Sequence, residues 1–162
     1  MQAIIFVGVQ GSGKSTYYRE HFFHTHVRVS LDLLRTRHRE QIFLHSCLAT
    51  QQRFVIDNTN TQRSEREVYI AAARAAKFQV VGYYFDVNLE TAIDRNNQRT
   101  GGQLIPVKGV VGTFRRLEKP ALDEGFDLLY TLRPSEVHGW TIVAVETAAP
   151  AKVDTGQQSS PP

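Results

Sequence analysis

The sequence predicts an α/β fold, in which helices cover both faces of a parallel β-sheet. Two observations lead to this prediction. Short apolar segments alternate with longer polar segments that suit helices, and the first apolar run, residues 3–7, is followed at once by a glycine-rich loop and a helix-compatible run. Strands that alternate with helices form crossovers between parallel strands, so we expect a three-layer sandwich with a sheet of about five strands.

The expected strands are short and apolar, as suits parallel strands that are covered on both faces. They comprise residues 3–7, 27–30, 54–57, 79–85 and 126–132, with 140–145 as a candidate sixth strand. The expected helices comprise residues 14–23, 31–52, 63–77, 89–99 and a segment that starts at Pro106. Asn88 suits an N-cap, and Gly101-Gly102 suits the end of a helix. After Pro106, apolar residues recur at helical spacing.

The size of the chain suits one domain, which we place at residues 1–147, and the composition of residues 148–162 predicts a disordered tail. Lys and Arg number 19 against 16 Asp and Glu, a balance too mild to indicate nucleic acid by itself. Cys47 is the only cysteine, which excludes an internal disulfide and suits a reducing compartment. Without a signal-peptide pattern or an apolar run near the roughly 20 residues of a membrane span, we expect a cytoplasmic protein.

Residues 8–16, Gly-Val-Gln-Gly-Ser-Gly-Lys-Ser-Thr, fit the pattern G-x-x-x-x-G-K-S/T between a strand and a helix. Glycines let backbone N–H groups point inward, and a helix N-terminus adds a positive dipole end, so such a loop can hold phosphates. The pattern predicts a P-loop NTPase fold that binds ATP and Mg²⁺, with Ser15 at the metal. The alternative is a glycine-rich turn that binds nothing. The expected phosphate-binding residues are Gly8, Gly11, Ser12, Gly13, Lys14, Ser15 and Thr16.

Charged residues lie near the ends of further strands, at the edge where ligands bind in such sheets. Asp32 could accept a proton from an attacking hydroxyl, or it could merely favour a helix start. Asp57 could help to hold Mg²⁺, or it could bond its own turn. Arg95 and Arg99 share one helix face before a flexible Gly-Gly pair, as in a helical lid that closes over phosphates. The alternative is an exposed basic face.

Six segments of the sequence resemble motifs of a known protein family. They are the P-loop, Val29-Ser30-Leu31-Asp32 with Arg35, Val55-Ile56-Asp57-Asn58-Thr59-Asn60, Arg95-Asn96-Asn97-Gln98-Arg99, Ile105-Pro106-Val107 and Leu122-Asp123-Glu124-Gly125-Phe126. In these segments the chain resembles the kinase domain of the polynucleotide 5′-kinase family, which includes animal polynucleotide kinase/phosphatases and phage polynucleotide kinases. The resemblance runs from about Ala3 to Leu132.

The resemblance implies transfer of the ATP γ-phosphate to the 5′-hydroxyl end of DNA or RNA. It implies that Asp32 is the general base and that Lys14 is catalytic at the phosphates. Arg99, with Arg95, would be the lid arginine, and Arg35 would contact the substrate's phosphate and aid catalysis. On the substrate side, the resemblance implies Asp32, Arg35, Thr59 and Asn60.

The sequence also departs from the family. Ser30 stands where animal members have Asn. When the Thr59-Asn60 pair is aligned, the carboxylate of the phage signature falls at Asn58, which leaves the role of Asp57 at the metal open. The chain has no D-x-D-x-T motif, so we expect no 3′-phosphatase activity in it.

Two alternatives to the polynucleotide kinase remain. One is a P-loop kinase that phosphorylates a small hydroxyl compound such as a sugar acid. The other is a non-catalytic nucleotide-binding module of a larger repair or RNA-processing assembly. An intact set of Lys14, Asp32 and Arg99 argues against the second alternative.

Overall fold

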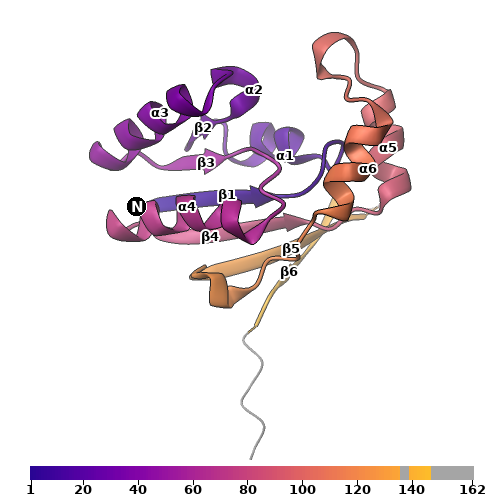
Figure 1. The fold of residues 1–162 in the computed structure, drawn as a ribbon. Coiled ribbons are helices and arrows are strands. Elements are labelled where there is room, and N and C mark those ends of the chain that lie inside the picture. Colours follow the sequence, from indigo (N-terminus) through magenta and orange to yellow (C-terminus); the bar gives the residue numbers. More distant parts are fainter. Residues whose placement is uncertain (136–138, 147–162) are drawn as a thin grey trace, which may run out of the picture.

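The computed structural model describes residues 1–135 and 139–146, which form a six-stranded sheet with helices around it (Figure 1). The strand order is β2-β3-β1-β4-β5-β6, with β1 in the interior between β3 and β4. The first five strands are parallel and β6 is antiparallel to β5. The expected parallel sheet and sixth strand are confirmed. The strands are β1 Gln2–Val7, β2 Val27–Val29, β3 Phe54–Ile56, β4 Gln79–Phe85, β5 Leu128–Ser135 and β6 Gly139–Ala144.

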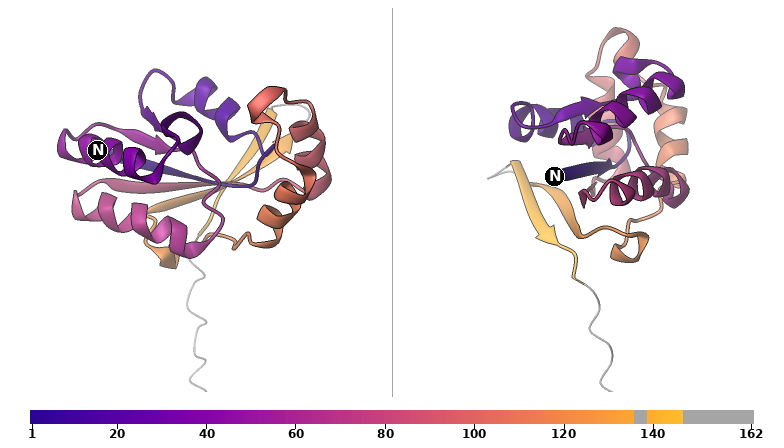
Figure 2. Two further views of the ribbon diagram at one scale, coloured as in Figure 1. Left: turned by 45° about the horizontal axis from the view of Figure 1, so that its top comes forward. Right: turned by 90° about the vertical axis from the view of Figure 1, so that its left-hand side faces the viewer.

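The side chains of β1 alternate between the two faces of the sheet and so separate two cores. Ile4 and Phe6 pack with residues of α1 (Lys14–His21). Ala3, Ile5 and Val7 pack with residues of α3 (Arg37–Ala49) and α4 (Arg63–Ala75) on the other face (Figure 2). The sheet therefore lies between two helical layers, as the sequence predicts.

A second group of helices stands beyond the carboxyl ends of the strands (Figure 1). It consists of α5 (Leu89–Asn97) and α6 (Val107–Arg115), with the short η1 (Gly101–Gln103) between them. The short η2 (Leu122–Glu124) is not part of this group, because it packs against α4 just before β5 begins. Val9 of the glycine-rich loop packs with Ala92 of α5 and Val110 of α6, so these helices are tied to that loop. Among the described residues, no helix is long and apolar enough to cross a bilayer.

The expected single helix over residues 31–52 is wrong, because the chain breaks it at Arg35. The first part is α2 (Leu31–Leu34), and Arg35 ends it with a left-handed φ of 70°. Thr36 is extended, and its side chain accepts a hydrogen bond from the backbone N–H of Arg39, which caps α3. A threonine cap inside a helix-compatible run is thus enough to start a new helix. The expected tail, residues 148–162, lies outside the described residues.

A buried ion pair fixes the segment that follows β3. The side chain of Arg66 in α4 is fully buried, and its Nε and Nη2 donate to Glu124 at 2.6 and 2.7 Å. Its Nη1 donates to the carbonyl oxygens of Asn60, Thr61 and Glu118. One guanidinium therefore joins α4 to the turn after β3 and to the segment that leads into β5.

Glu124→Ala should lower the free energy of unfolding by about 3 to 5 kcal/mol, because it leaves the buried charge of Arg66 without a counter-ion. Chemical denaturation measures this change. The matched control is Asp123→Ala, which removes the exposed pair to Arg63 at 3.4 Å. An exposed pair contributes about 0.2 to 1 kcal/mol, so equal losses in the two variants would contradict this account.

Candidate functional site

The loop after β1 is tightly wound because two glycines adopt conformations that other residues rarely take. Gly11 has a φ of 76° and Gly13 a φ of 97°. A Cβ on Gly11 would lie 2.1 Å from the carbonyl oxygen of Ala92 in α5, and a Cβ on Gly13 would lie 2.8 Å from the ring of Trp140 in β6. The loop is therefore packed closely against both elements, and neither glycine can be replaced without moving one of them.

Lys14 is buried at the start of α1, and its ammonium group points into the loop. Its Nζ donates to the carbonyl oxygens of Gly8 at 2.8 Å and Val9 at 2.7 Å, and to Ser12 Oγ at 3.3 Å. These three acceptors match the three donors of an ammonium group. The loop thus supplies oxygen atoms to a buried cation whose ordinary partner in this motif is phosphate.

The charges around Lys14 come from three separate segments. Burial lowers the pKa of Lys14 to about 8, while Asp57 raises this pKa, Arg99 lowers it and Asp32 raises it. The structure therefore brings Asp32, Asp57 and Arg99 within electrostatic reach of one ammonium. These are three of the residues that the sequence singles out for chemistry, and their roles stay predictions.

Oxygen atoms suited to a hard cation lie beside this lysine. Ser15 Oγ donates to Asp57 Oδ2 at 2.9 Å, and the carboxylate of Asp57 is buried. Mg²⁺ prefers oxygen ligands and in kinases is commonly held by few protein groups together with the substrate's phosphates. Among residues 1–135 and 139–146, no cluster of three or more His, Cys, Asp or Glu side chains could hold a metal alone. Ser15 and Asp57 therefore fit a metal that is also held by phosphates.

Arg28 of β2 bonds to both of these side chains, Ser15 and Asp57. Its Nε donates to Asp57 Oδ2 at 2.7 Å, and its Nη2 donates to Ser15 Oγ at 2.9 Å. The sequence analysis missed this residue, because an arginine inside a short strand gives no sign that the neighbouring strand ends in its carboxylate partner.

Asp32 lies exposed in the first turn of α2, where a network of buried polar groups fixes the helix start. The backbone N–H of Leu31 donates to Asn58 Oδ1 at 2.9 Å. The other end of the same amide donates to Glu40 Oε1 at 2.5 Å, and the hydroxyl of Tyr69 donates to that oxygen at 3.1 Å. Asn58 therefore links the end of β3 to the helix that carries Asp32.

The turn at Thr59 and Asn60 supports the glycine-rich loop. The backbone N–H of Gly8 donates to the carbonyl oxygen of Thr59 at 2.9 Å. Asn60 is buried, and its Nδ2 donates to the carbonyl oxygen of Phe6 at 2.7 Å. The amide of Asn60, which the resemblance places on the substrate side, is thus directed at β1. Substrate contact by these two residues stays a prediction.

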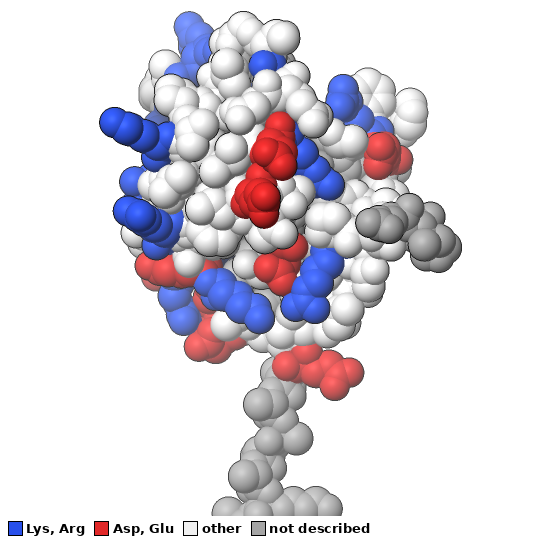
Figure 3. Space-filling view, turned by 90° about the vertical axis from the view of Figure 1, so that its right-hand side faces the viewer, with Lys and Arg blue, Asp and Glu red and all other residues white. Residues whose placement is uncertain are grey.

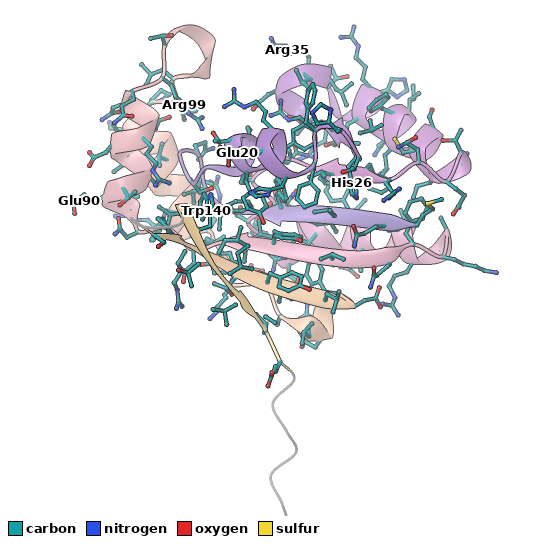
Figure 4. The ribbon with its side chains drawn as sticks, turned by 180° about the vertical axis from the view of Figure 1, so that it is seen from behind. Glu20, His26, Arg35, Glu90, Arg99 and Trp140 are labelled. Carbon is teal, nitrogen blue, oxygen red and sulfur yellow. The ribbon has the colours of Figure 1, made fainter. Side chains whose placement is uncertain are left out.

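Arg95 lies in the last turn of α5, whereas Arg99 lies beyond the end of this helix. The helix ends at Asn97, earlier than the sequence predicts, and Arg99 follows it with its N–H bonded to the carbonyl oxygen of Asn96. Arg95 Nη1 lies 3.7 Å from the position of a Cβ on Gly13, so it reaches the glycine-rich loop. Figure 4 shows Arg99, just after α5, and Arg35, just after α2, on either side of the P-loop end of the sheet.

Trp140 is a second residue that sequence reasoning missed. It packs edge-on against Tyr17 of α1 at 6.0 Å and Phe85 of β4 at 5.3 Å between ring centroids. The antiparallel pairing of β6 with β5 returns the chain to the P-loop and puts this ring against Gly13 (Figure 4). No local pattern signals such a return, because the contact joins residues from opposite ends of the described chain.

The fold and this loop define a P-loop nucleotide-binding protein. Residues 4–116 match the family described as AAA domain (AAA_33), and the chain belongs to that family.

Solved structures of P-loop proteins share the fold at low sequence identity. Kti12 from Chaetomium thermophilum, solved with ADP-AlF3, is 17% identical with a TM-score of 0.62, over 83% of this chain and 91% of that chain. A sugar kinase from a Janibacter species is 19% identical with a TM-score of 0.60, over 82% and 85% of the two chains. A gluconokinase from Sinorhizobium meliloti 1021 is 18% identical with a TM-score of 0.57, over 82% of each chain.

Above pH 8, the binding of ATP should be accompanied by uptake of a proton by Lys14. The phosphates favour the charged form of Lys14 and so raise its pKa above the value of about 8 in the free protein. Affinity for ATP should therefore fall as the pH rises through 8. Calorimetric titration at pH 8.5 in buffers of different ionisation enthalpy measures the uptake. Lys14→Arg, which stays charged, is the control, and a binding heat that does not depend on the buffer in the native protein would contradict the prediction.

Proposed function

We propose that this protein is an ATP-dependent kinase that transfers the γ-phosphate of ATP to a hydroxyl group. The observation that carries the proposal is the P-loop that encloses the ammonium of Lys14, with Ser15 Oγ bonded to the buried carboxylate of Asp57 at 2.9 Å beside it. Asp32 and Arg99 also act on the charge of Lys14. A phosphate-binding lysine, a metal-side carboxylate, an exposed carboxylate and a lid arginine are the parts that phosphoryl transfer requires.

Each part has a task in the reaction. The backbone N–H groups of the P-loop and Lys14 would hold the β and γ phosphates, and Ser15 and Asp57 would hold a Mg²⁺ that neutralises charge on them. The acceptor's hydroxyl oxygen forms a bond to the γ-phosphorus, its proton passes to Asp32, and the bond from that phosphorus to the leaving oxygen of ADP breaks. Arg99 and Arg95 stabilise the negative charge on the transferring group.

A small hydroxyl compound is the acceptor that is best supported. Two of the structures similar in fold are named as a gluconokinase and a sugar kinase. In addition, Asn58 and Asn60, which belong to the segment that resembles polynucleotide kinases, direct their amides at Leu31 and Phe6. These contacts account for the segment through the packing of the site itself, without a nucleic acid.

The charge on the outside of the lid also suits a small acceptor. Glu90 and Asp94 of α5 are exposed, and on the face that carries α5 and α6 acidic side chains lie among the basic ones (Figure 3). Proteins that bind single-stranded nucleic acid usually present a continuous basic groove along its backbone. The mixed charges on this face differ from such a groove.

The 5′-hydroxyl end of DNA or RNA is the second candidate acceptor, and the position of Arg35 favours it. This residue is exposed three positions after Asp32, and its left-handed backbone ends α2 there. Arg37 and Arg39 follow it and are exposed. An arginine beside the attacking hydroxyl could bind the first phosphate of an oligonucleotide.

Transfer of label from γ-labelled ATP to a panel of acceptors tests the function. The panel contains gluconate, other sugars, and DNA and RNA oligonucleotides with a 5′-hydroxyl. Label on a sugar or sugar acid would support the main proposal. Label on oligonucleotides alone, falling steeply with salt, would support the second candidate. ATP bound with neither transfer nor hydrolysis would overturn both.

Asp32→Asn should lower kcat by about 10²- to 10⁴-fold, because the amide cannot accept the proton of the hydroxyl. Its affinity for ATP should stay within about twofold of the native value, because the P-loop is untouched. Asp123→Asn, an exposed change in η2, is the control. Normal turnover in Asp32→Asn would remove Asp32 from the chemistry.

Arg35→Ala separates the two acceptor classes. With a small acceptor, kcat/KM should change by less than about threefold, because one exposed charge has little effect across solvent. With an oligonucleotide, KM should rise by about tenfold and the salt dependence should weaken, because one phosphate contact is lost. Steady-state kinetics at two salt concentrations decide between them.

A further inference from the structure

Arg28 contacts both of the side chains that would hold the metal of this site, Ser15 and Asp57. Its guanidinium is 2.6 Å from Asp57 Oδ2 as an ion pair, and it also donates to Ser15 Oγ at 2.9 Å. The Arg28 side chain is 23% exposed and the Asp57 side chain 1%. A cation that is part of the chain thus already lies on both oxygen-bearing groups that fit Mg²⁺.

The two cations compete for the same oxygens. A serine hydroxyl has one hydrogen and two lone pairs. Here the hydrogen goes to Asp57, and Arg28 donates to a lone pair. A divalent ion on the remaining lone pair would lie only a few ångströms from the guanidinium, where like charges repel strongly. Arg28 must therefore leave Ser15, at least, before Mg²⁺ can bind there.

The structure offers Arg28 a second partner. Its Cζ lies 5.7 Å from the centre of the Tyr18 ring, within the range of a cation–π contact. The ring is therefore in contact with the guanidinium while Arg28 is paired with Asp57, and this contact does not depend on that pair.

We propose that Arg28 is a built-in counter-cation that keeps free divalent metal away from Ser15 and Asp57 when no nucleotide is bound. Mg²⁺ then enters only with the nucleotide, whose phosphates supply the charge and the ligands that displace Arg28. The inference rests on the proposed function in one respect, namely that the site takes a nucleotide with its metal.

Arg28 also explains how a buried carboxylate is stable without metal. An ionised carboxylate is costly to bury unless it is paired. In the nucleotide-free protein the ion pair with Arg28 meets this requirement. The side chains of Asp57 and Ser15 can therefore keep their positions before a metal binds.

The test is binding of Mn²⁺ to the nucleotide-free protein, measured by electron paramagnetic resonance of free Mn²⁺. The native protein should bind Mn²⁺ weakly. Arg28→Met, which keeps the length of the side chain and removes its charge, should bind Mn²⁺ at least about tenfold more tightly, because the two oxygens become free. Arg28→Lys should resemble the native protein. Arg74→Met, which removes the exposed pair to Asp127, is the matched control.

Asp57→Asn in the Arg28→Met background should abolish the gain, which places the ion at this carboxylate. Equal Mn²⁺ affinity in the native protein and Arg28→Met would overturn the proposal, as would a gain that survives Asp57→Asn. If Arg28→Met fails to fold, as judged by circular dichroism, Arg28→Gln takes its place in the same comparison. The readout needs neither nucleotide nor turnover, so loss of the proposed kinase activity would be seen separately in the transfer assay.

Discussion

The buried ammonium of Lys14 is the constraint on which the site depends. A charge out of water must be met by polar groups, and the carbonyl oxygens of Gly8 and Val9 and the hydroxyl of Ser12 meet it here. The loop can supply them only because the turn after β3 bonds to its first residue, Gly8. The three acceptors all belong to the loop, so the shape of the loop is tied to this one cation.

Two contacts within the chain therefore involve groups that would also bind the ligands. The ammonium of Lys14 donates to carbonyl oxygens where it would otherwise contact phosphate. The carboxylate of Asp57 pairs with the guanidinium of Arg28 where it would otherwise contact a metal. Binding would exchange these contacts for those of the ligand without building a new site. Preorganised groups of this kind need little rearrangement when charge develops during a reaction.

The strands and the P-loop could be predicted from sequence because each depends on local pattern. Residues 3–7 are apolar throughout, and the glycines of the loop stand at fixed spacings. The break at Arg35 was missed because Thr36 suits a helix interior and a cap alike until packing decides. The partners of Asn58, Arg28 and Trp140 could not be predicted, since each is set by which strands are neighbours in the sheet and by the antiparallel return of β6. The same strand order explains why Asp32 and Asp57 both act on the charge of Lys14, while their roles in chemistry stay predictions.

A crystal structure of the protein with ADP, Mg²⁺ and aluminium fluoride tests the central claim most directly, that Lys14 and Arg28 exchange contacts within the chain for contacts made with the ligands. The account predicts that Lys14 Nζ exchanges the carbonyl oxygens of Gly8 and Val9 for the phosphate and its fluoride mimic. It also predicts that Ser15 contacts the metal and that Arg28 leaves Ser15. A structure in which the nucleotide is bound at the P-loop while Lys14 and Arg28 keep their present partners would contradict the account.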